Sequence, residues 1–575
     1  MTTAAPGKAP AKLNDLGAYV EGLLKDWDTP GTAVAVVEDG EIVFRQGFGK
    51  RNLAEDLPVT TSTVFSIASC TKSICAASLA ILADEGKLDW ETPVRAYLPD
   101  FALADPVATE RITPRDLVTH RSGLPRHDAV WYGSGLSREE MVRRLRYLEP
   151  TTDLRAVWQY QNLMYLTAGY LAGKLAGCEW EALVQQRLFD PLGMTDSACS
   201  VTRAEQMPDH ARPYREQDDE TKEVPFRNID VIAPAGAITS SIDDMSRWLL
   251  LNLNRGEYDG GRIISEAQMA QLHAPQMVMP TWNKYPESSL PAYAHGWAVD
   301  SYRGHTKVSH GGNIDGFSSL VSFLPNDGLG VVVLTNKNGS PIPNAITFTV
   351  FDRLLGLPAV PWNERFLKDA ADVKAAAGAG KDRTATERVT GTSPSHPLAD
   401  YAGTYEHPGY GRMVIGLKDD ALDVRFNAMM GPLPHRHYDT FDHEYQGLGA
   451  TVPFTFTTDA GGDIVSVAAP LEPTVKDIVF TRRPPAEMQD ERFLEGLVGI
   501  YDWSGQPLVV SFRDSTTLQV AIPGMPAADL APRRGTEFRV GDRTGFRLEF
   551  VVDAAGKATA VTLITPLGVH VATKS

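Results

Sequence analysis

Residues 66–73 read SIASCTKS and place a serine, Ser69, three positions before a lysine, Lys72. Every other lysine in the chain lacks a serine at that offset. The apolar run CTKSICAASLAILADEGKL predicts a helix that begins here and ends near Gly86. Because residues three apart share one face of a helix, the Lys72 amine can point at the Ser69 hydroxyl. The spacing alone is common, so the pair indicates chemistry only if other motifs join it.

The pair has a chemical logic that depends on its surroundings. A serine hydroxyl is a weak nucleophile until a base accepts its proton. A helix N-terminus and burial both favour a neutral lysine over a charged one, and a neutral amine can act as that base. The reaction would also need a proton shuttle and an oxyanion site.

Two later stretches offer such partners. Residues 158–162 read WQYQN and put Tyr160 and Asn162 at the start of the apolar run MYLTAGYLAG. Residues 309–313 read SHGGN, in which two glycines follow His310 within a strand-like region. Glycine in a strand often marks the close approach of a ligand or another backbone. Taken alone, each stretch is more often structural: a packing tyrosine before a helix, or a turn or bulge.

In this order, SCTK, YQN and HGG resemble the motifs of the serine β-lactamase and penicillin-binding-protein superfamily: Ser-x-x-Lys, Tyr-x-Asn, and Lys-Thr-Gly or His-x-Gly. Several flanking stretches resemble it too: VFSIASCTKS, LVTHRSGL, FDPLGMTDS, PAGAITSSIDDMSRWL and HGGNIDGFSS. The chain is most similar to the class C-like branch, which includes D-aminopeptidases and family VIII esterases. This resemblance covers about residues 15–360. Residues 398–575 resemble the lipocalin-like barrels appended to D-aminopeptidase-type members.

The resemblance implies a role for each residue of the first two motifs. Ser69 would be the nucleophile that becomes acylated, and Lys72 would be the base or hydrogen-bond partner that activates it. Tyr160 would exchange a proton with Ser69 and with the leaving group. Asn162 would hold Lys72 and the substrate amide.

The resemblance also assigns the third motif, where this chain departs from the lysine version. His310 would line the far wall and bond the catalytic tyrosine or the substrate. The backbone N–H groups of Ser69 and Asn313 would form the oxyanion hole, each worth about 3 kcal/mol, and Gly311 and Gly312 would contact the substrate. A lysine would offer a substrate carboxylate a fixed charge, which a neutral imidazole does not. The departure favours an amidase, peptidase or esterase over a true β-lactamase.

The distribution of strand and helix patterns predicts an α/β (α+β) fold. Residues 32–48, TAVAVVEDGEIVFRQGF, predict a strand hairpin that turns at Asp39-Gly40, and strands return between Ala294 and Asn336. Helical patterns fill the chain between them. After a disordered N-terminus at 1–12, we therefore expect one domain at 13–362 with an antiparallel sheet and a helical cluster. The resemblance implies that this is a β-lactamase-like catalytic domain.

An internal repeat follows a helix and an Ala-, Gly-, Thr- and Ser-rich linker at 363–397. LADYAGTY ends at Tyr405 and LEGLVGIY ends at Tyr501, while FTTDAGGDIVSV and FVVDAAGKATAV carry Asp459 and Asp553. The shared spacing predicts two copies, each rich in short strands. The expected domains are a first lipocalin-like antiparallel β-barrel at 398–484 and a second at 485–575.

Composition limits the partners of the chain. The 575 residues carry a formal charge of −17 with no basic run, which argues against nucleic acid and anionic membranes as partners. The N-terminal MTTAAPGKAPAKLNDLG has no apolar signal segment, and the four cysteines lack CxxC spacing, so we expect free thiols in the cytoplasm. HRHYDTFDHEY, residues 435–445, fits neither HExxH nor a CxxC pair and is interpreted as a barrel loop. No metal or cofactor is expected.

The leading functional hypothesis is a serine hydrolase that forms an acyl-enzyme with the amide or peptide bond of a small-molecule or peptide substrate. Ester hydrolysis and acyl transfer to an amine, as in penicillin-binding-type peptide cyclases, stay open because they use the same site. A binding protein that keeps the fold is the non-enzyme alternative. A homodimer stays open, as does a barrel loop near Met429-Met430-Gly431 that reaches the catalytic cleft.

Overall fold

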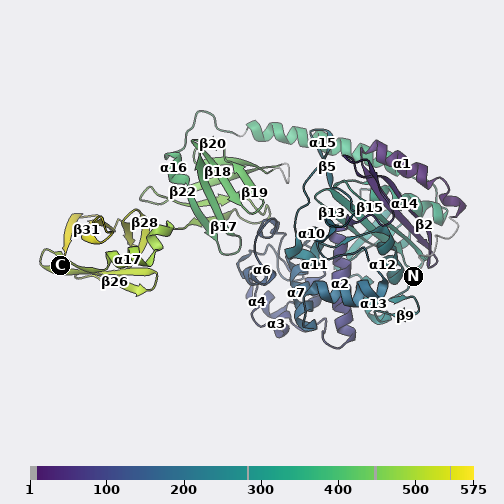
Figure 1. Cartoon of the computed structure of the whole chain (residues 1–575), viewed down its shortest axis with the longest axis horizontal. Helices are drawn as coiled ribbons and strands as arrows, with labels where there is room; N and C mark the ends of the chain where they lie inside the picture. Colours follow the sequence, from purple (N-terminus) through teal and green to yellow (C-terminus); the bar gives the residue numbers. More distant parts are fainter. Residues whose placement is uncertain (1–9, 281–283, 387, 446–449, 544) are drawn as a thin grey trace. The chain divides into compact units, whose positions relative to one another are not determined.

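The computed structural model describes residues 10–280, 284–386, 388–445, 450–543 and 545–575. The chain forms two compact units, Met1–Thr386 and Glu387–Ser575 (Figure 1). The disorder predicted for residues 1–12 falls mainly outside the described residues, and Ala11–Leu13 forms a short 3₁₀ helix. No helix in the described part of the chain is both long and apolar enough to cross a membrane.

An antiparallel sheet of nine strands forms the centre of the first unit, in the order β10-β11-β12-β13-β14-β15-β1-β2-β3. The strands are β1 (Gly31–Glu38), β2 (Glu41–Asn52), β3 (Leu57–Pro58), β10 (Met277–Val278), β11 (Ser288–Tyr293), β12 (Ala298–Tyr302), β13 (His305–Ile314), β14 (Phe317–Leu324) and β15 (Leu329–Thr335). β1 pairs with β15, so that Val34 lies opposite Val333. The predicted sheet, built from distant segments of the chain, is confirmed.

The central position of β1 follows from its sequence. GTAVAVVE alternates β-branched and small residues, which suit a strand packed on both faces, and only Glu38 is not fully buried. The turn to β2 uses Asp39 and Gly40, whose φ angles are +51° and +80°. Two positive φ angles are those of the two-residue turn that best matches the twist of a hairpin.

Helices cover both faces of this sheet (Figure 1). On one face, α1 (Leu16–Asp26) and α14 (Ile342–Leu355) form a core with β1 and β15. On the other face lies α12 (Ile242–Leu253), whose Leu249 packs against Gly330 of β15. Beyond it are α2 (Thr71–Asp84) and α7 (Asn162–Ala176), which are buried on nearly all sides and apolar all round, as is usual for central helices.

Shorter elements complete the first unit. The helices are α3 (Val94–Tyr97), α4 (Pro106–Arg111), α5 (Pro114–Leu117), α6 (Arg138–Arg144), α8 (Trp180–Val184), α9 (Asp190–Leu192), α10 (Val201–Ala204), α11 (Ala233–Gly236) and α13 (Glu266–His273), and the strand pairs are β4 (Phe65–Ser66) with β7 (Thr239–Ser240), β5 (Tyr214–Gln217) with β6 (Glu220–Glu223), and β8 (Glu257–Tyr258) with β9 (Gly261–Arg262). The last helix of the unit, α15 (Trp362–Thr386), includes the first part of the predicted linker. Alanine has the highest helix propensity, and VKAAAGAGKD supplies four alanines where the sequence was interpreted as a linker.

The second unit is built from two antiparallel β structures. The first is a nine-stranded sheet in the order β19-β18-β17-β16-β24-β23-β22-β21-β20, and the second closes into a barrel of β25 to β32. In the described residues β19 and β20 are not paired with each other, so the first repeat is a half-barrel. The strands are β16 (Gly403–His407), β17 (Gly411–Lys418), β18 (Ala421–Phe426), β19 (Met429–Pro432), β20 (His435–His437), β21 (Thr440–Tyr445), β22 (Ala450–Thr458), β23 (Ile464–Ala469), β24 (Ile478–Arg482), β25 (Gly499–Trp503), β26 (Gln506–Asp514), β27 (Thr517–Ala521), β28 (Ala528–Arg534), β29 (Glu537–Val540), β30 (Arg547–Val552), β31 (Ala558–Thr565) and β32 (Gly568–Lys574), with helices α16 (Leu398–Tyr401) and α17 (Glu491–Leu497) before the two repeats.

The repeat predicted from the sequence is confirmed, because equivalent residues of the two copies make the same hydrogen bonds. The hydroxyls of Tyr405 and Tyr501 each donate to the carbonyl four residues earlier, at 2.8 and 2.6 Å. The carboxylates of Asp459 and Asp553 each accept from the backbone N–H groups two and four residues later. Both copies therefore begin with the same helix-to-strand connection and contain the same turn. The histidine-rich stretch 435–445 forms the β20–β21 hairpin rather than a loop. In β21, Phe441, His443 and Tyr445 are buried and Asp442 and Glu444 between them are more exposed, as expected for a strand.

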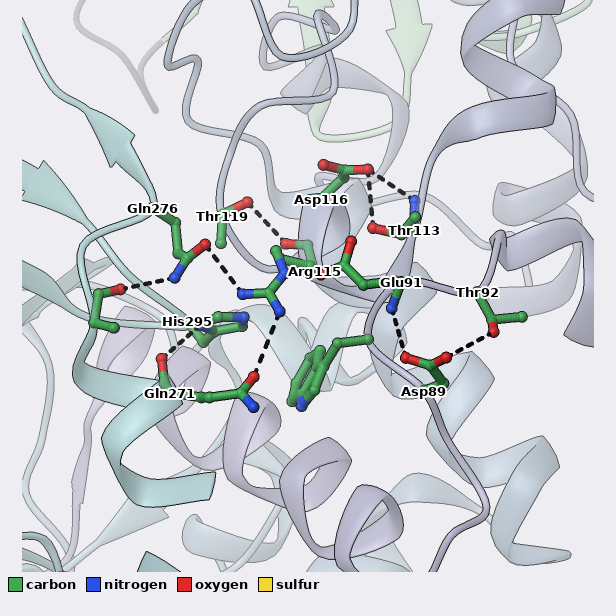
Figure 2. Close-up of polar contacts among 12 residues, drawn as sticks. Asp89, Glu91, Thr92, Thr113, Arg115, Asp116, Thr119, Gln271, Gln276 and His295 are labelled. Atoms are coloured by element: carbon green, nitrogen blue, oxygen red, sulfur yellow. Dashed lines mark hydrogen bonds and ion pairs between the residues drawn. The ribbon is translucent and has the colours of Figure 1, made fainter. Parts of the chain in front are cut away.

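A polar network in the first unit holds the helical layer together (Figure 2). Arg115 of α5 donates to the side chains of Gln276 (3.1 Å), Gln271 (3.4 Å) and Glu91 (2.5 Å). His295 is completely buried, and its Nδ1 donates to the Gln271 carbonyl at 2.9 Å. Burial lowers the pKa of His295 to about 3. Since α13 packs on α2, this network supports the helix that follows the Ser-x-x-Lys motif.

The buried histidines predict an acid-sensitive fold. Burial lowers the pKa of His273 to about 4 and that of His295 and His310 to about 3, against about 6.5 in the unfolded chain. The unfolded chain therefore binds protons first as the pH falls. Stability should be fully present above about pH 6.5 and should decrease below it by about 1.4 kcal/mol per pH unit for each histidine.

Urea unfolding of the full chain between pH 7 and pH 5 measures this slope. His295→Gln should reduce the slope of stability against pH by the contribution of about one bound proton, about 1.4 kcal/mol per pH unit. An unchanged slope in His295→Gln would contradict the assignment.

Candidate active site

The turn that carries Ser69 lies between β4 and α2. Ala68 precedes the serine with φ +46°, a left-handed conformation that costs a non-glycine residue about 1 kcal/mol or more. Two hydrogen bonds hold the turn: the Ile67 N–H donates to the Ile238 carbonyl (3.0 Å), and the Ser319 hydroxyl donates to the Ile67 carbonyl (2.7 Å). Ser69 is partly exposed, whereas the residues that follow it in α2 are buried. The strained turn thus presents the Ser69 hydroxyl at the end of a buried helix.

Strand β13 lies directly against this turn. A Cβ atom on Gly312 would stand 2.2 Å from the Ile67 carbonyl oxygen and 2.3 Å from the Ser319 hydroxyl. The Cys70 thiol also donates to the His310 carbonyl at 3.0 Å. Gly311 is different, because its Cβ position has no neighbour nearer than 3.8 Å and the residue is exposed. The close approach expected from the two glycines is confirmed for Gly312.

A methyl group at each glycine tests this contact. Gly312→Ala should displace the Ser69 turn and slow acylation by about 10² or more, since misplacement by about 1 Å costs that much. Gly311→Ala is the matched control and should acylate a small fluorophosphonate at close to the wild-type rate. Stopped-flow labelling measures both, and equal rates in the two variants would show that β13 does not position the serine.

Lys72 is placed to act as a base. Its Nζ lies 3.0 Å from Ser69 Oγ and donates to the Ala235 carbonyl of α11 at 2.7 Å. The side chain is completely buried. Burial, and next the nearby Arg126 guanidinium, hold the pKa of Lys72 well below its usual range, while Asp128 opposes them. A lowered pKa gives the amine an uncharged form that can accept the Ser69 proton.

Tyr160 completes the group around the serine. The Tyr160 hydroxyl hydrogen-bonds the Ser69 side chain, and Lys72 Nζ lies 4.7 Å from the centre of the Tyr160 ring. Burial raises the pKa of the Tyr160 phenol. The phenol therefore keeps its proton at neutral pH, so it is suited to pass a proton on rather than to remain as a phenolate.

Asn162 and His310 lie near this centre, but with other partners than the resemblance implies. Asn162 Nδ2 donates to Asp128 Oδ1 at 3.0 Å, and the hydrogen bonds of the Lys72 amine go to other residues. His310 Nε2 accepts from the Tyr293 hydroxyl at 2.9 Å, while its Nδ1 donates to the Gly311 carbonyl at 2.8 Å. Burial lowers the pKa of His310 to about 3, so the ring is neutral at physiological pH.

Asn313 follows the two glycines and is the next-to-last residue of β13. Its side-chain oxygen accepts from the Ser318 hydroxyl (3.1 Å) and from the Gly339 N–H (2.7 Å), which fixes the strand end. The oxyanion role of the Asn313 and Ser69 N–H groups stays a prediction, as do the substrate contacts of Gly311 and Gly312.

Sequence reasoning missed a charged pair beside the site. Asp128 Oδ2 accepts from Arg126 Nε at 2.6 Å, and its Oδ1 accepts from Trp131 Nε1 at 2.8 Å as well as from Asn162. The Arg126 guanidinium carbon lies 5.1 Å from the centre of the Tyr160 ring, in the range of a cation–π contact. The stretch RHDAVW carries no motif spacing, so only the folded chain shows that this pair lies beside Tyr160.

The pair predicts opposite shifts in the pH dependence of kcat/KM. Arg126 lowers the pKa of Lys72 and Asp128 raises it. Arg126→Gln should therefore move the acid limb to higher pH, and Asp128→Asn should move it to lower pH. His310→Asn should leave the midpoint in place, because His310 does not titrate in that range. Shifts of the same sign in the two variants would rule out Lys72 as the titrating group.

Comparison with known proteins places this geometry in a family. The Beta-lactamase family model matches residues 16–350. The chain belongs to the beta-lactamase family. A model described as a domain of unknown function, DUF3471, matches residues 387–482, which contain the half-barrel.

Relatives of this beta-lactamase-family chain are named as hydrolases. An unguisins hydrolase of Aspergillus violaceofuscus is 29% identical over 72% of this chain and 78% of that protein. Another from Aspergillus campestris is 30% identical over 70% and 77%.

Solved structures show the same fold. The octameric penicillin-binding protein homologue from Pyrococcus abyssi aligns with a TM-score of 0.55 and 21% identity over 82% of this chain and all of that one. The D-amino acid amidase from Ochrobactrum anthropi SV3 aligns with a TM-score of 0.50 and 23% identity over 60% of this chain and 99% of that one.

Proposed function

We propose that the chain is a serine hydrolase that forms an acyl-enzyme on Ser69 and cleaves amide or peptide bonds. The observation that carries this proposal is the buried Lys72 amine, 3.0 Å from Ser69 Oγ, with the Tyr160 hydroxyl bonded to the same serine. The names of the relatives, unguisins hydrolase and D-amino acid amidase, support hydrolysis and favour amides as the substrate class. The proposed reaction uses no cofactor. We expect the protein to act in the cytoplasm.

The geometry suggests a path for each proton. Ser69 Oγ attacks the acyl carbon as its proton moves to Lys72 Nζ, directly or through the Tyr160 hydroxyl. The N–H groups of Ser69 and Asn313 would stabilise the negative carbonyl oxygen. The C–N bond then breaks as the leaving nitrogen takes up the proton. In the second half, water attacks the ester carbonyl as its proton moves to the same base. The bond between the acyl carbon and Ser69 Oγ then breaks, the proton passes from the base to Oγ, and the acid is released.

Covalent labelling tests the nucleophile. A fluorophosphonate should add one adduct to the wild type and none to Ser69→Ala, as measured by intact-protein mass spectrometry. Ser73→Ala is the matched control on the same helix: its hydroxyl donates to the Cys70 carbonyl at 2.8 Å, and the variant should still be labelled. An adduct of equal yield in Ser69→Ala would refute the proposal, and no adduct in any form would favour the binding-protein alternative.

A substrate panel tests the bond that is cleaved. D- and L-aminoacyl anilides, matching p-nitrophenyl esters and a chromogenic cephalosporin should give anilide turnover and little cephalosporin turnover. Tyr160→Phe should slow the anilides by about 10² to 10⁴ and the p-nitrophenyl esters less, because that leaving group departs without a proton. Ester turnover without anilide turnover would favour the esterase, and products joined to an added amine would favour acyl transfer.

A further inference from the structure

His120 lies beside Tyr160, but it has no part in the proposed reaction. It belongs to the stretch LVTHRSGL and follows α5, and its side chain is completely buried. Its backbone has φ +56°, a left-handed conformation that few residues other than glycine adopt. A buried, strained, titratable residue next to a catalytic centre calls for a structural reason.

The contacts of His120 fall on both sides of Tyr160. The Gln159 N–H donates to the His120 carbonyl at 2.8 Å, and the Gln161 N–H donates to His120 Nδ1 at 3.0 Å. Between these two bonds, the centres of the His120 and Tyr160 rings are 4.3 Å apart. One residue thus holds the backbone before and after the tyrosine and also packs on its ring.

The protonation state of His120 follows from the same contacts. Nδ1 accepts a hydrogen bond from a backbone N–H, so the ring proton must lie on Nε2. Nε2 has no hydrogen-bond partner among the described residues and is enclosed by aromatic rings, with those of Tyr293 and Tyr165 at 4.6 and 5.1 Å. Burial, with the nearby Lys72, holds the pKa of His120 well below its usual range. A second proton would occupy Nδ1 and remove the acceptor from the Gln161 N–H.

Tyr160 needs such support because its segment has no regular structure. α7 begins at Asn162, and Gln161, its N-cap, has the extended φ and ψ of −141° and 116°. Proton transfer needs heavy atoms within about 2.6 to 3.2 Å, so the tyrosine hydroxyl must stay close to Ser69. Without hydrogen bonds to its flanking residues, the segment could shift by the distance of about 1 Å that is costly in catalysis.

We propose that His120 is a positioning residue for Tyr160: its carbonyl and Nδ1 fix the backbone on either side of the tyrosine, and its ring sets the tilt of the phenol toward Ser69. The proposal rests on the proposed role of Tyr160 in proton transfer. Three substitutions separate the parts of the contact. His120→Phe keeps a ring and loses the acceptor, His120→Asn keeps an acceptor near the Nδ1 position and loses the ring, and His120→Ala loses both.

A double-mutant cycle with Tyr160→Phe measures the coupling between the two residues. A general packing role of His120 would not produce such coupling. His120→Phe should lower kcat for an aminoacyl anilide by about tenfold to a hundredfold, with KM changed by less than about threefold. In the Tyr160→Phe background the same substitution should cost less than about threefold, because the hydroxyl it positions is gone. Rates are taken per active site, counted by fluorophosphonate labelling.

Each outcome of the cycle has one meaning. Suppose that Tyr160→Phe alone lowers kcat and that His120→Phe lowers kcat as much in the Tyr160→Phe background as in the wild type. His120 then does not act through the tyrosine, and the positioning proposal is refuted. If Tyr160→Phe alone keeps the wild-type kcat, the proposed proton path is wrong, and the positioning proposal fails with it. A negligible additional loss in the double variant supports both.

The asparagine and alanine variants keep the test decisive if the phenylalanine does not fit. Asparagine tolerates the left-handed backbone and supplies an oxygen acceptor to the Gln161 N–H. His120→Asn should therefore have a kcat at least about tenfold above that of His120→Ala. Thermal unfolding checks that both variants are folded. Equal kcat in these two variants would overturn the acceptor role of Nδ1.

Discussion

The removal of the Lys72 amine from water is the constraint on which the first unit depends. A primary amine in water is charged at neutral pH and cannot accept a proton. Here helix α2 is enclosed on all sides over its first three turns, and the amine contacts Ser69, the Ala235 carbonyl and the rings of Tyr160 and Tyr165. Such enclosure needs layers of helices over the large sheet, with α7, α11 and α13 packed around α2. The architecture therefore encloses the one side chain that the proposed acid–base chemistry requires.

The sheet holds the Ser69 turn through the C-terminal half of β13. The pairing of β13 with β14 brings Ser319 and Gly312 against the Ile67 carbonyl, so the strained Ala68 turn is held by the sheet itself. Strain at such a turn persists only where the surroundings over-determine it. Ser69 with Lys72, Tyr160, and His310 thus come from three segments of the chain: the start of α2, the segment before α7, and β13.

Charge in the site is arranged differently from the lysine version of the third motif. His310 is neutral and engaged with Tyr293, so β13 carries no fixed positive charge toward the serine. The positive charge lies on the opposite wall, where Arg126 stacks over Tyr160 and pairs with Asp128. Because Asp128 also accepts a hydrogen bond from the Asn162 amide, one carboxylate affects the pKa of Lys72 and holds a residue of the second motif.

The sequence by itself determined the features that depend on neighbours along the chain. Alternating β-branched residues and an Asp-Gly turn specify the β1–β2 hairpin, the offset of three residues puts Lys72 on the Ser69 side of α2, and the repeated Tyr and Asp spacings specify two similar β structures. The tertiary structure alone decided the partners across the fold. The pairs of His310 with Tyr293, of Asn162 with Asp128, and of His120 with the segment around Tyr160 join elements whose distance in the chain says nothing about their distance in space. Sequence spacing fixes which residues share a face of one element, whereas the packing of whole elements fixes which faces meet.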